Sequence, residues 1–172
     1  HAAQLAGKET RLRDLRAVVT ASRSVSLDEE GKAMAKSLSE TLDSRVTGLS
    51  DEWVGRINAA LEAGKVADAL RVATRSPEPS TRLPAELATQ LAAKASAAMT
   101  AETDPREWMA LLDAVVDSPV RRNVKPAGIP AETDVEAAAR NAAGHVPALA
   151  PLLGMKIPPP PPPTARRVVH RP

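Results

Sequence analysis

Residues 104–116 read DPREWMALLDAVV, and this stretch decides the fold class of the chain. Asp104 is a preferred N-cap residue, Pro105 suits the first position of a helix, and Glu107 closes an arrangement like a capping box. Apolar side chains follow at helical spacing: Trp108, Leu111, Leu112, Val115 and Val116. The stretch therefore predicts an amphipathic helix that buries one face.

Similar patterns extend along the chain on both sides of this helix. We expect helices at residues 2–23, from a capping box at Ser26 to Gly48, from a cap at Ser50 to Gly64, and directly afterwards from Val66. Further helices are expected after Pro84, from a capping box at Thr133, and at residues 146–153. The chain has no Phe and no Tyr, and it is rich in alanine, the strongest helix former. The fold class is therefore predicted to be all-α.

The predicted helices group into three parts. Residues 1–49 are expected to form an antiparallel helical hairpin, because the turn at residues 25–28 is short. Residues 50–157 are expected to form a small helical bundle or a short α-solenoid. The solenoid alternative rests on a Ser-Pro, loop, Pro-Ala-Glu pattern at residues 76–86 that recurs at 118–132. Residues 158–172 begin with six prolines and are expected to be a disordered tail.

Four large apolar side chains are predicted to pack in the interior: Leu12, Leu38, Trp53 and Trp108. Leu38 belongs to a stripe at four-residue steps that also contains Met34, Leu42 and Val46. Each tryptophan lies on the apolar stripe of its helix. A core position with a partner for the indole N–H is the expected role, and an exposed interface anchor is the alternative.

Positive charge is concentrated in two segments of a nearly neutral chain, whose net charge is +2. The loop at residues 120–126 and the tail both carry basic residues and no acidic ones. The candidate contact residues are Arg121, Arg122, Lys125, Arg166, Arg167 and Arg171. No aromatic residue lies between these charges, so neither segment offers a platform for stacking nucleic acid bases.

Catalytic, metal and cofactor chemistry find no support in the residue pattern. The absence of cysteine excludes disulfides, thiolate zinc sites and cysteine catalysis, and no glycine-rich phosphate loop is present. His145 lies in a turn without a recognisable catalytic context. The carboxylates at residues 28–30 and 51–52 are predicted in first helical turns, where they complement the helix dipole. We therefore expect no enzymatic activity, no metal and no cofactor.

Two functions remain after these exclusions, and both are binding functions. The first is a non-catalytic adaptor module that mediates protein–protein assembly through the first helix pair and the tail, with a partner of unknown identity. The alternative is a nucleic-acid-associated protein that contacts phosphates through residues 120–126 and the tail. A cytoplasmic location is expected, because the chain lacks cysteine and any apolar run long enough to cross a membrane. The oligomeric state is left open.

Overall fold

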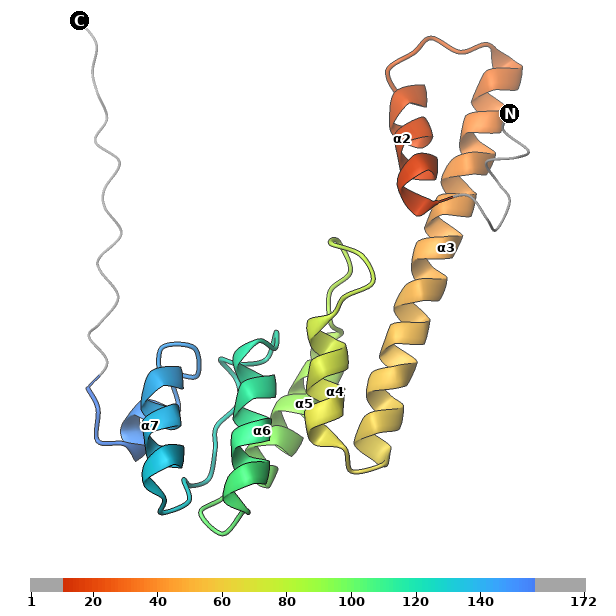
Figure 1. The fold of residues 1–172 in the computed structure, drawn as a ribbon. Helices are drawn as coiled ribbons and strands as arrows, with labels where there is room; N and C mark the ends of the chain where they lie inside the picture. The colour runs from red at the N-terminus through yellow and green to blue at the C-terminus, as the bar shows by residue number, and fades with distance from the viewer. Residues whose placement is uncertain (1–10, 157–172) are drawn as a thin grey trace, which may run out of the picture. The chain divides into compact units, whose positions relative to one another are not determined.

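The computed structural model describes residues 11–156, and within that range it contains seven helices and no strand. The fold is therefore all-α, as predicted (Figure 1). The helices are α2 (Leu12–Ser22), α3 (Glu29–Glu62), α4 (Val66–Thr74), α5 (Ala85–Ala98), α6 (Pro105–Val116), α7 (Thr133–Ala142) and α8 (Leu149–Leu152). Residues 2–10 of the first predicted helix and the predicted tail lie outside the described residues.

The chain divides into two compact units, His1–Leu87 and Ala88–Pro172. The division falls within α5, near its beginning. The first unit contains α2, α3 and α4, and the second contains α6, α7, α8 and most of α5. The predicted boundary between residues 49 and 50 lies inside α3.

α3 is a single helix of 34 residues, and the predicted helix end at Gly48 is wrong. A glycine inside a helix costs only about 1 kcal/mol relative to alanine, so one residue does not outweigh good helix formers on both sides. Gly48 therefore continues the helix. α3 does end next to Gly64, as predicted, because this glycine adopts a left-handed φ of 73° just after the helix.

The beginning of α3 also differs from the prediction. The cap is Asp28 rather than Ser26, and its side chain accepts a hydrogen bond of 2.7 Å from the backbone N–H of Gly31. Glu29 and Glu30 follow in the first turn, where they complement the positive end of the helix dipole. Asp28 is the stronger cap here, since its carboxylate both accepts the N–H and carries negative charge.

α2 packs on the first part of α3 and runs in the opposite direction (Figure 1). The buried cluster between them consists of Leu15, Val19 and Leu38, and two partly buried residues surround it, Val18 and Leu42. The antiparallel hairpin is therefore present, and Leu38 is buried as predicted. Two details are corrected, because Leu12 is only partly buried and Met34 is exposed. Both lie beyond the short stretch in which the two helices bury side chains.

α4 returns along the last part of α3, and Trp53 joins the two helices (Figure 1). The indole ring is 1% exposed, and its N–H donates to the carbonyl of Val72 at 2.7 Å. Ile57 and Leu70 are fully buried in the same unit. Trp53 is therefore a core residue with a satisfied indole, as expected.

Trp108 has the same role in the second unit. It lies fully buried on α6, and its N–H donates to the carbonyl of Gly128 at 3.1 Å. α6 starts at Pro105 as predicted, with Asp104 accepting from the backbone N–H groups of Arg106 and Glu107. The reciprocal bond of a capping box, from the backbone N–H of Asp104 to the Glu107 side chain, is not formed. The predicted capping box of α7 is absent: Thr133 is the first helical residue, and the N-cap Glu132 makes no side-chain cap. α8 is also shorter than predicted.

Candidate functional site

The loop between α6 and α7 is held to its unit by buried apolar side chains. Val120 and Val124 are 1% and 0% exposed, and Pro126 is buried as well. The backbone N–H groups of Asn123 and Val124 donate to the carbonyl of Val120, which closes a tight turn between the two valines. Val120, Val124 and Pro126 are therefore buried, whereas Arg122, Asn123 and Lys125 between them are exposed.

The second half of the loop is held in place by hydrogen bonds. Its partners lie in α5, in the residues that connect α5 with α6, and in α6. The backbone N–H of Lys125 donates to Ser96 Oγ at 2.8 Å, and that of Ala127 donates to the carbonyl of Met99 at 2.9 Å. The carbonyl of Gly128 accepts the indole of Trp108. A Cβ at Gly128 would lie 2.8 Å from the backbone nitrogen of Ala101, so only glycine permits this approach. The loop backbone is therefore well defined.

Three basic side chains lie on this well-defined loop. Arg122 and Lys125 are exposed, while Arg121 is partly buried and places its guanidinium 3.4 Å from the carbonyl of Ser118. None of the three forms an ion pair within the described part of the chain. The structure thus brings three predicted contact residues together, whereas Arg166, Arg167 and Arg171 lie outside the described residues.

The chemistry of the loop is electrostatic. Exposed cations on a fixed backbone attract anions without having to reorganise the chain first. Trp108, the aromatic residue beneath the loop, is buried and supports the backbone, so it is not available to stack on a base. The charge of these side chains suits contact with phosphates or carboxylates, and the described part of the loop offers no exposed aromatic ring on which a base could stack.

The hairpin of α2 and α3 carries most of the exposed large apolar side chains. Val25 is 61% exposed in the turn, and Met34 and Leu49 are 48% and 38% exposed on α3. The other two exposed large apolar side chains of the described residues are Leu152 and Met155, near the C-terminal end of that range. No residue of α3 between Leu38 and Trp53 is buried. We call residues 12–49 the arm.

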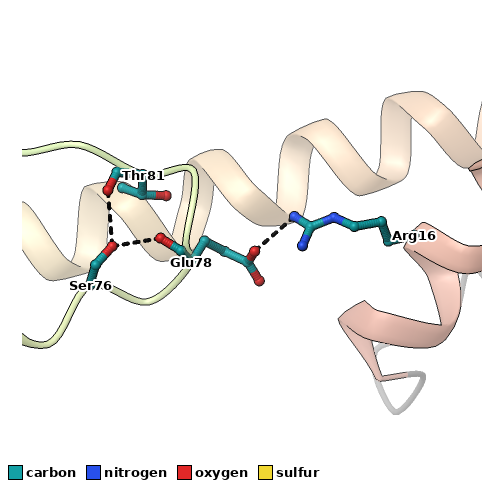
Figure 2. A network of polar contacts seen from close by, with 4 residues as sticks. All are labelled: Arg16, Ser76, Glu78 and Thr81. Carbon is teal, nitrogen blue, oxygen red and sulfur yellow. Dashed lines mark hydrogen bonds and ion pairs between the residues drawn. The ribbon is translucent and has the colours of Figure 1, made fainter. Parts of the chain in front are cut away.

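An ion pair connects the arm with the loop between α4 and α5 (Figure 2). Arg16 Nη2 on α2 lies 2.7 Å from Glu78 Oε2, and Glu78 is only 8% exposed. The approach is out of line with the guanidinium N–H bonds, so the contact is electrostatic rather than a well-formed hydrogen bond. Ser76 Oγ lies 2.7 Å from the carbonyl of Glu78 and 3.0 Å from that of Thr81, which shapes this loop.

Sequence reasoning missed this ion pair. Arg16 and Glu78 are far apart in the chain, and no spacing rule relates them. One local signal exists, since Glu78 stands between Pro77 and Pro79, which restrict the backbone around it. That signal indicates a rigid loop but does not identify its partner.

The residues considered for catalysis are dispersed in the structure. His145 is exposed after α7, and the carboxylates of Asp51 and Glu52 are exposed in the middle of α3. The expectation that this second pair lies in a first helical turn is wrong, because α3 has no break at Gly48. Within residues 11–156, no three His, Cys, Asp or Glu side chains gather in a way that would hold a metal ion.

No helix of the described range combines the length and the apolar character that crossing a bilayer requires. In comparisons with known proteins, the chain matches no family model, no curated protein and no solved structure.

Proposed function

We propose that the protein is a non-catalytic, cytoplasmic interaction module that assembles with another protein chain through the arm. The observation that carries this proposal is the group of exposed apolar side chains on the arm, Val25, Met34 and Leu49. Three of the five exposed large apolar side chains in the described residues lie on this one hairpin, where a partner can cover them. Elsewhere in the described part of the first unit, the large apolar side chains are buried or partly buried, and none is exposed.

The structure of α3 makes the arm suitable for this role. One continuous helix has its last part packed on α4 and extends through residues 39–52, where no side chain is buried. A partner that covers this part of the helix gains apolar burial, at about 25 cal/mol per Å², without competing with the core. The rigid helix also reduces the entropy lost on binding.

Photocrosslinking from the arm tests this proposal. A photoreactive amino acid replaces Met34 in the full chain, and the matched control replaces Lys36, whose exposed side chain lies two residues further along the same helix and points to another side. We expect discrete protein adducts from Met34 and none from Lys36. The Leu49→Gln change should weaken the Met34 adducts. The absence of adducts, or equal adducts from both positions, would contradict the proposal.

A second candidate function is supported by a separate observation, the fastened basic loop. Arg122 and Lys125 present unpaired charge within the described residues, on a backbone that the fold already holds in place. This arrangement favours contact with the phosphates of a nucleic acid without sequence specificity. The tail arginines would add to the same electrostatic surface.

Salt titrations test the second candidate. Fluorescently labelled duplex and single-stranded nucleic acids are titrated with the full chain, with a chain ending at Ile157, and with the Arg122→Gln, Lys125→Gln double variant. Because each phosphate contact contributes about 0.9 to the salt slope of duplex binding, we expect the double variant to reduce that slope by roughly 2. Lys65→Gln with Lys94→Gln removes the same charge from exposed positions outside the loop and serves as the control. No binding at low salt would exclude this function.

A further inference from the structure

Few contacts hold α2 against the rest of the first unit. Its buried residues are Leu15 and Val19, which contact Leu38 of α3. Within the described residues, one ion pair, between Arg16 and Glu78, connects it to another element. We call the surface that receives it, formed by Leu38, Leu42 and Glu78, the α2 seat. A short helix with few buried apolar contacts is the kind of element that opens locally, and α2 has 11 residues, two of them buried.

The turn that follows α2 contains no residue that excludes helical geometry. Its one local constraint is the Asp28 cap, whose hydrogen bond from the N–H of Gly31 would be replaced by a helical one if the turn opened. Residues 23–28 read RSVSLD, with no glycine and no proline. Positive φ among the described residues occurs at Gly64 and Gly154 alone, so no turn residue adopts a left-handed conformation. The N–H groups of Arg23 and Ser24 still bond backward to Thr20 and Ala21, as in the last turn of a helix. The same residues are therefore able to continue α2 directly into α3.

We propose that two copies of this chain exchange α2, so that the α2 of each copy occupies the α2 seat of the other and residues 12–62 form one helix. This inference names the partner of the arm as a second copy, and it rests on the proposed function. Exchange reforms the same apolar contacts and the same ion pair between two chains, which makes it a low-cost route to a dimer.

The chemistry of the seat selects α2 as its occupant. The seat requires two apolar residues one helical turn apart and a guanidinium directly after the first of them, which α2 supplies as Leu15, Arg16 and Val19. Val25 in the turn and Met34 in the second turn of α3 are exposed. When the turn opens, both come to the junction between the two copies and gain burial there.

The absence of native cysteine permits a direct test by disulfide trapping in the full chain. Val19→Cys and Leu38→Cys are made as two separate variants, mixed at high concentration and oxidised. A bond between the two sulfurs then requires α2 of one chain on α3 of another. A chain that carries both Val19→Cys and Leu38→Cys serves as the positive control. Its intramolecular disulfide shows that the two sulfurs are close enough to bond. Thr20→Cys with Lys36→Cys, both at exposed positions, measures random collision.

We expect mass spectrometry to show a mixed disulfide of twice the chain mass for the Val19→Cys and Leu38→Cys pair, increasing with protein concentration. The exposed pair should not produce it above the collision background. A yield equal to that background at every concentration would overturn the exchange.

A hinge variant tests the continuous helix. The N–H of Val25 makes no hydrogen bond, so Val25→Pro removes none, yet proline cannot continue the helix and disfavours helical geometry at Ser24. We expect Val25→Pro to abolish the mixed disulfide and Val25→Ala to retain it. An undiminished yield in Val25→Pro would overturn the proposal. Failure of exchange leaves Met34 photoadducts with another protein intact, whereas failure of the proposed function removes all adducts, so the two failures are distinguishable.

Discussion

Gly48 and Gly64 should respond in opposite ways to the same substitution. Gly48 lies inside α3 with open space around it, so Gly48→Ala should raise the free energy of unfolding by about 0.5–1 kcal/mol. Gly64 has a φ of 73°, so Gly64→Ala should lower it by roughly 1–2 kcal/mol. Urea denaturation measures both. A destabilising Gly48→Ala would indicate that α3 ends at that glycine.

The two indole hydrogen bonds should each have a measurable effect on stability. Trp53→Phe and Trp108→Phe keep most of the ring volume but leave the carbonyls of Val72 and Gly128 without their donors. We expect each change to lower the free energy of unfolding by about 1–3 kcal/mol, measured by thermal denaturation. In each variant the remaining tryptophan should be shielded from iodide quenching, since both rings are at most 1% exposed. Efficient quenching would contradict the core assignment.

At the residue scale, the sequence predicted most where the cause is local. The cap of α6 at Asp104 and the burial of both tryptophans follow from spacing within one helix, and the structure confirms them. The ion pair of Arg16 with Glu78 could not be predicted, because it depends on how the hairpin and a distant loop come together.

At the scale of elements, the ion pair should couple α2 to the loop between α4 and α5. Arg16→Met leaves the carboxylate of Glu78, 10% exposed, without its cation, and should lower the free energy of unfolding by about 1–2 kcal/mol. This range is at the low end for a buried pair, because the arginine side chain is 43% exposed.

The double variant Arg16→Met, Glu78→Gln completes a mutant cycle for this pair. Since it removes the buried charge together with its partner, it should recover part of the stability that Arg16→Met loses. Arg71→Met serves as the control, because its ion pair with Asp68 is exposed on both sides and should matter little. Additive effects of the two substitutions would show that Arg16 and Glu78 do not interact.

Helix positions were predictable at this scale, and helix ends were less so. Helices α5 and α6 begin close to where Pro84 and the Asp104 cap indicate, and α4 begins at Val66, directly after the stop at Gly64. The two helices expected on either side of Gly48 are one, because glycine weakens a helix but does not by itself end it. A left-handed residue ends it, and Gly64 shows that conformation only in the structure.

At the scale of the whole molecule, the charged residues of the candidate site could be predicted from the sequence. The hydrogen bonds that hold the backbone of this loop could not. The sequence shows Arg121, Arg122 and Lys125 in a loop without acids. It does not show that Ser96 and Met99 hold the backbone of that loop, because those contacts come from another helix and the turn after it. The exposure of Met34 was likewise invisible, since its spacing matches that of the buried Leu38. A stripe at helical spacing identifies a face, and tertiary packing determines how much of it is covered.

The central claim, that the arm is presented by one uninterrupted helix, is tested most directly by a distance measurement between two spin labels on α3. The chain has no native cysteine, so Lys36→Cys and Asn58→Cys label two exposed positions on either side of Gly48 without background. At 1.5 Å per residue, a continuous helix predicts a narrow distribution centred near about 33 Å. A broad distribution centred well below that distance would show that the helix breaks at Gly48, and the arm would then not be a rigid extension of the first unit.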